Sequence, residues 1–301
     1  MTGLDALIAA GTVVENVALG PLTTYKSGGP ARYLMEADRL EDLEELAASG
    51  VSAALRVLVI GRGSNLVVAD SGFPGLVIHL GPGFGAIDID GSVVAAGSSA
   101  PLAQVARASV NAGLTGLEFF VGVPGSVGGA VRQNAGCFGV ETRDRLIEAT
   151  IFDLIDGGIA TRTPVQLEMS YRHSNIGASQ VVVGATFQAE PGDVSAGLQE
   201  LRRITRWRRD NQPGGTFNAG SVFKNPPGTT AGEIIDSLGL KGTMVGDVAV
   251  SARHANFFVA GPDATSSDIR RLVMVVKDRV LEETGTILEP EIQFVGFEDD
   301  H

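Results

Sequence analysis

Short strand-like runs recur along the chain, and stretches with helical spacing lie between some of them. Alternating or β-branched apolar runs predict strands at residues 32–36, 56–60, 76–80, 86–89, 93–96, 150–154, 158–162 and 181–188. The dipeptide Asp156-Gly157 indicates a hairpin turn between two of these runs. The strands between residues 76 and 96 follow one another closely, so this part of the chain is predicted to form a sheet without regular helical crossovers.

Apolar residues at helical spacing predict helices at 40–47, 102–113, 198–209, 230–241 and 267–285. Asp38 is followed three residues later by Glu41, which is the spacing of a capping box at the start of a helix. Thr230 and Glu233 repeat this spacing. We expect Ser267 to cap the last helix and a short strand at 288–296 to follow it.

The composition is that of a folded globule. The chain has 301 residues, of which 44% are apolar and 19% charged, and this length favours two or three lobes. Its 40 glycines indicate several turns or backbone-lined binding loops, because glycine is costly inside helices and strands. The net charge of -12 argues against a general nucleic-acid binder. Arginines within 202–209 alternate with apolar helix positions, so we interpret them as a solvated helix face.

The cysteine content and the hydropathy of the chain indicate its cellular compartment. Cys137 is the single cysteine, so an intrachain disulfide is excluded and a reducing compartment fits. The chain opens without a basic-then-apolar leader, and it contains no run of roughly eighteen apolar residues. We therefore expect a cytoplasmic protein, monomeric, with neither a membrane segment nor a nucleic-acid partner. No metal site is expected.

Two glycine-rich stretches are candidates for ligand binding. The predicted strand at 56–60 runs into Gly61-Arg62-Gly63-Ser64-Asn65, where side-chain-free backbone could direct N–H groups at a phosphate. This is not the dinucleotide-binding fingerprint, because the apolar run at 66–68 continues as a strand and opens no helix. The second stretch, 116–136, holds six glycines among apolar residues. We interpret it as a backbone-rich wall around a flat or phosphorylated ligand; the alternative is a tightly turned structural loop.

Two polar stretches are candidates for chemistry. Arg172 lies between Tyr171 and His173 in a predicted loop, and its guanidinium could bind a carboxylate or phosphate bidentately. An ordinary surface arginine is the alternative. The stretch 218–226 offers the hydroxyl of Ser221, the cation of Lys224 and an amide within five positions. By itself, a Gly-Ser turn ended by proline is more often an ordinary connection.

Taken in order, the motifs resemble the UDP-N-acetylenolpyruvoylglucosamine reductase family. The resemblance covers roughly residues 23–296. It rests on five motifs: Gly61-Arg62-Gly63-Ser64-Asn65; Pro124-Gly125-Ser126-Val127-Gly128-Gly129-Ala130 with Gln133-Asn134-Ala135-Gly136; Tyr171-Arg172 with Ser174; Ala219-Gly220-Ser221-Val222-Phe223-Lys224-Asn225-Pro226; and Leu288 with Glu291-Ile292. The sequence around 212–213 and 225–228 resembles the shorter, type II branch. Residues 216–218 and Cys137 depart from the family pattern, but neither touches the proposed chemistry.

The resemblance implies an α+β fold with a two-lobed FAD-binding region of the vanillyl-alcohol-oxidase type and a C-terminal α/β substrate-binding lobe. We expect the lobes at 1–80, 81–200 and 201–301. The implied enzyme is an NADPH-dependent reductase of peptidoglycan precursor synthesis. It would reduce the enolpyruvyl group of UDP-N-acetylglucosamine enolpyruvate through non-covalently bound FAD. The residues implied in cofactor binding are Gly61, Arg62, Gly63, Ser64, Asn65, Gly122, Pro124, Gly125, Ser126, Gly128, Gly129, Asn134, Ala135 and Gly136.

The resemblance also implies roles at the reacting centre. Arg172 would hold the enolpyruvyl carboxylate, and Ser221 would donate a proton to the α-carbon. Glu291 would assist at the enolic stage, with Glu289 as the alternative if the register is shifted. The residues implied in substrate binding are Tyr171, Lys224, Asn225, Lys241 and His254, with Lys241 suited to the diphosphate.

Two rival interpretations stay open at this point. Related FAD-binding lobes attach flavin covalently through histidine or cysteine, for which Cys137 or His79 could serve. The lack of disulfide pairs and the sequence around Ser221 argue against this. A nucleotide-binding module without catalysis would be expected to have lost Arg172, Ser221 or Glu291, and all three are present.

Overall fold

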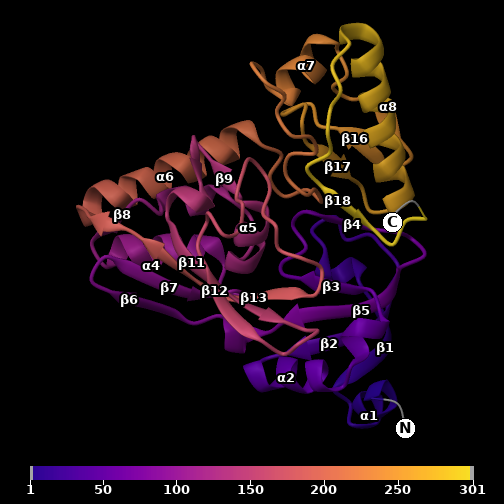
Figure 1. Cartoon of the computed structure of the whole chain (residues 1–301). Coiled ribbons are helices and arrows are strands. Elements are labelled where there is room, and N and C mark those ends of the chain that lie inside the picture. The colour runs from indigo at the N-terminus through magenta and orange to yellow at the C-terminus, as the bar shows by residue number, and fades with distance from the viewer. Residues whose placement is uncertain (1–2, 299–301) are drawn as a thin grey trace. The chain divides into compact units, whose positions relative to one another are not determined.

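The chain divides into two compact units that interleave along the sequence. The computed structural model describes residues 3–298. Unit 1 comprises the chain up to Glu15, Tyr33–Gly61 and Gly75–Trp207. Unit 2 comprises Asn16–Arg32, Arg62–Pro74 and the chain from Arg208 onward. Strands β1, β2 and β5 carry the chain from one unit to the other (Figure 1). The three-lobe boundaries expected above stay a prediction.

The first sheet of unit 1 has the order β1-β2-β5-β3. Its strands are β1 (Val13–Ala18), β2 (Pro30–Ala37), β3 (Val57–Ile60) and β5 (Phe73–Leu80). β3 and β5 run parallel, with Val57 opposite Leu76. The nearby helices are α1 (Gly3–Ala9), α2 (Leu40–Ala48) and α3 (Val51–Ala54). Buried Met35 in β2 packs in one apolar cluster with Leu43 and Leu46, which share one face of α2, so the amphipathic pattern of that helix is satisfied.

The second sheet of unit 1 is antiparallel, in the order β12-β11-β13-β7-β6. Its strands are β6 (Ile87–Asp90), β7 (Val93–Gly97), β11 (Leu146–Asp153), β12 (Ile159–Arg162) and β13 (Gln180–Gln188). The helices of this region are α4 (Leu102–Asn111), α5 (Val127–Gln133) and α6 (Val194–Asn211). Two short antiparallel strand pairs complete this region of unit 1. They are β8 (Leu114–Thr115) with β14 (Glu190–Pro191), and β9 (Gly136–Cys137) with β10 (Val140–Glu141).

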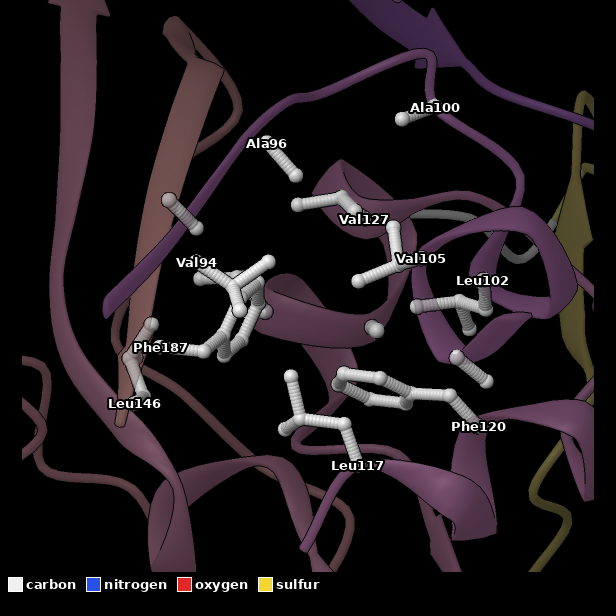
Figure 2. Packing of buried hydrophobic residues seen from close by; sticks show 14 of the residues in the cluster. Val94, Ala96, Ala100, Leu102, Val105, Leu117, Phe120, Val127, Leu146 and Phe187 are labelled. Carbon is white, nitrogen blue, oxygen red and sulfur yellow. The ribbon is translucent and has the colours of Figure 1, made fainter. Parts of the chain in front are cut away.

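A single apolar cluster joins this sheet to α4 and α5. Figure 2 shows Val94 and Phe187 of the sheet facing Val105 of α4, Val127 of α5 and Phe120. The rings of Phe120 and Phe187 meet edge to face, with centroids 5.3 Å apart. Because α5 packs on β7 and β13 through this cluster, the glycine-rich segment that contains α5 has a rigid support.

Unit 2 is built around a small sheet and one long helix. The sheet has the order β15-β16-β17, and β18 pairs in parallel with β4. The elements are β4 (Leu66–Val68), α7 (Ala231–Ser237), β15 (Met244–Val245), β16 (Val248–Val250), β17 (Phe258–Ala260), α8 (Ser266–Thr284) and β18 (Gln293–Val295). Tyr25 is buried in the same core as Val276 of α8 and donates a hydrogen bond to the Phe258 carbonyl at 3.3 Å. Burial raises the pKa of the Tyr25 hydroxyl.

Four 3-10 turns complete the described elements. They are η1 (Gly20–Leu22), η2 (Pro82–Phe84), η3 (Glu118–Gly122) and η4 (Thr142–Asp144). Among residues 3–298, no helix combines the length and apolar character needed to cross a membrane.

The predicted strands and helices are present, and the α+β class is confirmed, but two helix starts were predicted wrongly. The N–H groups before α2 donate to Asp42 and not to Glu41, because the helix begins two residues after Asp38. α8 is capped by Thr265, whose hydroxyl accepts the Asp268 N–H, and not by Ser267. The Ser267 hydroxyl instead donates to Asp70.

Other boundary predictions have mixed outcomes. The Thr230–Glu233 capping box is confirmed, and Gly285 ends α8 in the left-handed conformation as expected. The last strand is shorter than predicted: β18 contains only Gln293–Val295, so Glu289 and Glu291 lie before it. The backbone groups of these two residues bond to residues 222 and 224 instead of to a sheet strand, which explains the difference.

Candidate active site

The two glycine-rich stretches meet in unit 1. Gly61 directly follows β3, and Ser126 is the residue before α5; a Cβ built on Gly61 would lie 2.6 Å from Ser126 Oγ. A side chain at position 61 is therefore excluded unless Ser126 moves. Sequence alone did not show that these stretches come together, and their contact supports a common role.

The glycines of α5 differ in what surrounds them. A Cβ on Gly128 would lie 3.1 Å from Ser98 Cβ, so Gly128 is needed for close packing of α5 on β7. The nearest atom that a Cβ on Gly129 would meet is Ser126 Oγ, at 4.0 Å. The surface of α5 at Gly129 is therefore open, which is what a wall that a flat ligand approaches requires.

Gly63 and Asn65 belong to unit 2 and have local structural roles. Gly63 has φ +59, and its Cβ would lie 2.2 Å from the Leu22 carbonyl oxygen. Asn65 Nδ2 donates to the Glu291 carbonyl at 2.9 Å, and the Asn65 carbonyl accepts the Gln293 N–H at 2.9 Å. The loop predicted to bind a phosphate thus also fixes the segment that carries Glu291.

Asn134 ends α5 in the left-handed conformation, with φ 44, and is fully buried. Its Nδ2 donates to Glu141 Oε2 at 2.9 Å and to the Ser170 carbonyl at 2.8 Å. Its Oδ1 accepts the Arg143 N–H at 2.9 Å. Asn134 was predicted to bind the cofactor, but its side chain is hydrogen-bonded to other parts of the protein. A cofactor contact at this position would therefore be made by the Asn134 backbone.

Arg172 lies in a loop of unit 1 that is tied to the end of α5. Its Nη2 donates to the Gly136 carbonyl at 3.2 Å, and its Cζ lies 4.9 Å from the centre of the Tyr171 ring. Ser174 Oγ donates to the Arg132 carbonyl at 2.6 Å. The structure therefore brings the predicted arginine fork next to the glycine-rich wall of the same unit.

Ser221 lies in an extended segment of unit 2 between two other segments. On one side Ser221 pairs with Phe257, and the Val222 N–H donates to the Asn256 carbonyl at 2.8 Å. On the other side the Glu291 N–H donates to the Val222 carbonyl at 2.7 Å. Ser221 and Glu291, which are far apart in the chain, are thus held in adjacent backbone segments.

Asn256 fixes this segment through its side chain. It is buried, its Oδ1 accepts the Phe223 N–H at 2.9 Å, and its Nδ2 donates to the Phe223 carbonyl at 2.8 Å. Asn256 therefore acts as an extra strand partner for the residue two positions after Ser221. Sequence reasoning missed this role. The only signal was a polar residue directly before the apolar run 257–259.

The remaining predicted substrate residues of unit 2 have protein partners that orient them. Lys224 Nζ lies 3.4 Å from Glu289 Oε2, so the carboxylate of Glu289 already has a cation. Asn225 Oδ1 accepts the first N–H of α7, from Ala231, at 3.1 Å. Lys241 Nζ lies 2.6 Å from Asp236 Oδ2.

His254 is set up as a neutral hydrogen-bond donor. Its Nδ1 accepts the Asn256 N–H at 3.2 Å, which leaves the proton of a neutral ring on Nε2. Burial, with a smaller contribution from the charge of Lys241, lowers the pKa of His254. The imidazole is thus uncharged near neutral pH.

The two groups proposed for covalent flavin attachment differ in their surroundings. Cys137 Sγ donates to the Phe119 carbonyl at 3.1 Å and lies 2.6 Å from where a Cβ on Gly122 would be. His79 Nδ1 is buried and lies 3.6 Å from Glu36 Oε1, which is beyond hydrogen-bond distance. Within the described residues, no group of three or more His, Cys, Asp or Glu is arranged to hold a metal ion.

Comparisons with known proteins show which family this chain resembles. Residues 31–162 match the FAD binding domain family, and residues 212–295 match the family of the UDP-N-acetylenolpyruvoylglucosamine reductase C-terminal domain. The UDP-N-acetylenolpyruvoylglucosamine reductase of Parvibaculum lavamentivorans is 42% identical over 288 residues, covering 95% of this chain and 92% of that protein. The Synechococcus sp. protein of the same name is 42% identical over 300 residues, covering 98% and 97%.

A solved structure is similar over nearly the same length. The crystal structure of UDP-N-acetylenolpyruvylglucosamine reductase from Thermus caldophilus has a TM-score of 0.82 and 35% sequence identity, and the match covers 94% of this chain and 98% of that chain.

Proposed function

The chain belongs to the UDP-N-acetylenolpyruvoylglucosamine reductase family, and from this premise we propose that it uses NADPH to reduce the enolpyruvyl group of a UDP-sugar in two half-reactions. It is an FAD-dependent oxidoreductase of peptidoglycan precursor synthesis with a two-lobed FAD-binding fold. The observation that carries the proposed chemistry is the 2.7 Å hydrogen bond between the Glu291 N–H and the Val222 carbonyl, which holds the segments of Ser221 and Glu291 side by side.

The residues of unit 1 fit FAD. Gly129 presents an open helix surface, and Gly61 lies beside the start of α5 with no room for a side chain. We propose that this region, with the loop 61–65, binds the flavin nucleotide without a covalent bond. When bound, FAD supplies a carrier that accepts hydride from NADPH and delivers it to the β-carbon of the enolpyruvyl double bond.

Arg172 is proposed to hold the substrate carboxylate. Hydride arriving at the β-carbon leaves negative charge on the α-carbon and its carboxylate, and a guanidinium fork stabilises that charge as it develops. The hydrogen bond from Arg172 to the Gly136 carbonyl and the contact with Tyr171 limit where the fork can point. A cation that is already oriented needs little reorganisation when the charge appears.

Ser221 is proposed to give its proton to the α-carbon. A serine hydroxyl is a weak acid, so the resulting alkoxide needs stabilising neighbours. Lys224 follows three residues later, and we propose that it supplies positive charge. Glu291 is proposed to assist at the enolic stage. Glu289, whose carboxylate is paired with Lys224 at 3.4 Å, stays the alternative.

The substrate nucleotide is proposed to lie against residues of unit 2. Lys241 provides charge for the diphosphate, and His254 provides a neutral Nε2–H donor. Asn225 is oriented by its Oδ1, which accepts the Ala231 N–H at the start of α7, and we propose that it contacts the ligand from this position.

The test is stopped-flow absorbance of the flavin in the two half-reactions, with Ser221→Ala. NADPH-dependent bleaching should proceed near the wild-type rate, because protonation of the α-carbon belongs to the second half-reaction. Reoxidation by UDP-N-acetylglucosamine enolpyruvate should slow by roughly 10²- to 10⁴-fold, the usual loss on removing a general acid. Substrate affinity should change little, since one hydroxyl contributes modestly.

Ser221→Cys is the matched variant, because a thiol can donate a proton. It should recover part of the rate that alanine loses. An alanine variant that reoxidises at the wild-type rate would exclude Ser221 as the acid. Acid precipitation should release the flavin into the supernatant; flavin that stays with the precipitate would favour covalent attachment through Cys137 or His79.

A further inference from the structure

The loop that carries Arg172 adopts an unfavourable backbone. Glu168 has φ 48 and Arg172 has φ 55, both in the left-handed region that residues with side chains rarely adopt. Each such residue costs of the order of 1–3 kcal/mol, and the conformation persists only where surrounding contacts enforce it. The loop therefore needs contacts from elsewhere to keep Arg172 in place.

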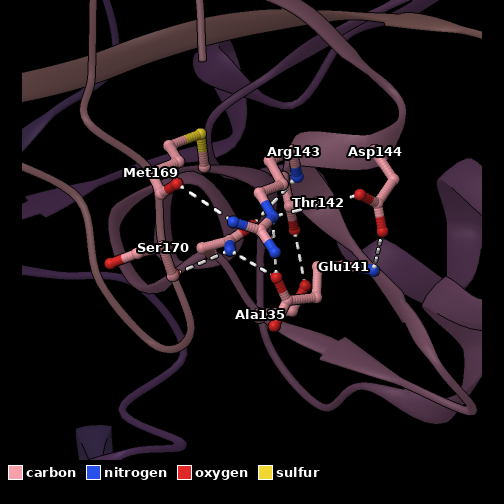
Figure 3. Close-up of polar contacts among 8 residues, drawn as sticks. Ala135, Glu141, Thr142, Arg143, Asp144, Met169 and Ser170 are labelled. Atoms are coloured by element: carbon pink, nitrogen blue, oxygen red, sulfur yellow. Dashed lines mark hydrogen bonds and ion pairs between the residues drawn. The ribbon is translucent and has the colours of Figure 1, made fainter. Parts of the chain in front are cut away.

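Two side chains outside the loop make those contacts. Arg143 Nη1 donates to the Met169 carbonyl at 3.2 Å (Figure 3). Asn134 Nδ2 donates to the Ser170 carbonyl at 2.8 Å. Met169 lies three residues before Arg172 and Ser170 two residues before it, so the two hydrogen bonds fix the backbone that leads into Arg172.

Arg143 is itself held in a closed set of contacts. Its Nε lies 2.9 Å from Glu141 Oε2, and the same oxygen accepts a hydrogen bond from Asn134 Nδ2 at 2.9 Å. Its backbone N–H donates to Asn134 Oδ1 at 2.9 Å. Because each of the three side chains orients the next, the guanidinium of Arg143 has little freedom to leave the Met169 carbonyl.

We propose that Arg143, oriented by Glu141, is a positioning residue that holds the fork of Arg172 for the substrate carboxylate. This inference rests on the role of Arg172 under the proposed function. A displacement of about 1 Å at a reacting centre can cost on the order of a hundredfold in rate. Arg143 acts through the Met169 carbonyl and the loop, without touching the substrate.

The test compares Arg143→Met with Arg145→Met. The Arg143 side chain is 43% exposed, so methionine is tolerated by the fold. Arg145 is a matched control: it lies two residues away and forms an ion pair with Glu190 at 2.7 Å, in a strand region apart from the Arg172 loop. FAD content and NADPH-dependent bleaching should stay near wild type in both variants.

Reoxidation by the enolpyruvyl substrate should slow by about tenfold to a hundredfold in Arg143→Met and stay near wild type in Arg145→Met. Arg143→Lys keeps the charge and one donor, so it should recover part of the rate. In an Arg172→Lys background, Arg143→Met should have little additional effect, because the fork that it positions is already lost.

Equal rates in the two methionine variants would overturn the inference, and so would a full, independent effect of Arg143→Met in the Arg172→Lys background. Loss of FAD from Arg143→Met and Arg143→Lys alike would also overturn it, since Arg143 would then support the flavin site. Failure of the proposed function is distinguishable: the wild-type protein itself would not be reoxidised by the substrate.

Discussion

Gly128 and Gly129 are neighbours on α5 with opposite surroundings. A side chain at Gly128 would press on Ser98, whereas the atom nearest to a Cβ at Gly129 is 4.0 Å away. Replacing Gly129 should therefore leave the fold intact and still obstruct a ligand that approaches this surface. The pair separates a glycine required for packing from one that we propose to be required for binding.

Gly129→Ala should raise the stability of the apoprotein while lowering its affinity for FAD. Alanine in a helix is favoured over glycine by about 0.5–1 kcal/mol. Urea unfolding of the apoprotein and titration with FAD, followed by flavin fluorescence, measure the two effects. Gly214→Ala is the control, since a Cβ there meets no atom within 4 Å. An alanine variant of Gly129 that binds FAD like wild type would remove Gly129 from the flavin site.

His254 should make the stability of the protein depend on pH. Burial and Lys241 lower the pKa of His254 from 6.5, so below pH 6.5 the unfolded chain takes up a proton that the folded protein resists. The contribution of neutral His254 to stability is thus present above pH 6.5. It is lost as the pH falls from 6.5 towards the lowered pKa of the folded state.

Thermal unfolding of wild type and His254→Gln between about pH 5 and pH 8 measures this contribution. The melting temperature of wild type should fall more steeply below pH 6.5 than that of the glutamine variant. Parallel curves would show that protonation of His254 is not coupled to folding.

At the scale of elements, the position of the backbone segment that carries Ser221 depends on the side-chain amide of Asn256. Asn256→Ala removes both hydrogen bonds from the buried side chain to Phe223. Leaving these backbone groups unpaired should destabilise the protein by about 2–4 kcal/mol. Reoxidation by substrate should slow as well, because Ser221 lies two residues before Phe223. Urea unfolding and stopped-flow absorbance measure the two effects.

Asn256→Asp sharpens this prediction. Aspartate keeps an acceptor for the Phe223 N–H but places a second oxygen against the Phe223 carbonyl, so it should not rescue the alanine variant. The exposed side chain of Asn175 makes a single bond to the Gln166 carbonyl, and Asn175→Ala should cost well under 1 kcal/mol. Equal stability of Asn256→Ala and Asn175→Ala would contradict the role given to Asn256.

Local patterns in the sequence predicted the elements, and contacts between distant segments explain what was missed. Thr230 and Glu233 cap α7 as their spacing predicts, because both partners lie within one helical turn. Ser267 lacks this spacing, because Arg270 follows three residues later, and its hydroxyl is bound to Asp70, 197 residues away. Thr265 and Asp268 do have the spacing, and they form the capping box of α8. The expected cap was wrong because it rested on the Ser267 hydroxyl without an acidic partner one turn later.

The same reasoning applies to the candidate site. The motifs of Arg172, Ser221 and Glu291 stand out as short runs of unusual residue types. Asn256 was not predicted because its side chain bonds to a backbone 33 residues away, and backbone groups carry no sequence signal. The support that Arg143 gives to the Arg172 loop was missed for the same reason, since it bonds to a carbonyl.

At the scale of the whole molecule, unit 2 cannot be cut out as the C-terminal part of the chain. Its core contains Tyr25 and Val67 together with residues of α8, and β18 pairs with β4. A fragment of residues 208–298 would lack both side chains and the strand partner, leaving apolar surface and backbone groups exposed.

We therefore expect the 208–298 fragment to show no cooperative thermal transition, whereas the full chain unfolds cooperatively. Near-ultraviolet circular dichroism and calorimetry are the measurements. The full chain under the same conditions is the control. A fragment with a sharp calorimetric transition and ordered aromatic signals would show that the early segments are dispensable for unit 2.

Because the two units alternate along the chain, parts of unit 2 are synthesised on the ribosome long before their partners in the same unit. Asn65 and Glu291, which hydrogen bond in the folded protein, are 226 residues apart, so the buried valines of β4 emerge long before β18 exists. A nascent chain must keep that apolar strand from pairing with other chains until translation is almost finished. A transcript truncated before codon 293 would thus yield a product for chaperones and proteases to remove, and not an enzyme of reduced activity.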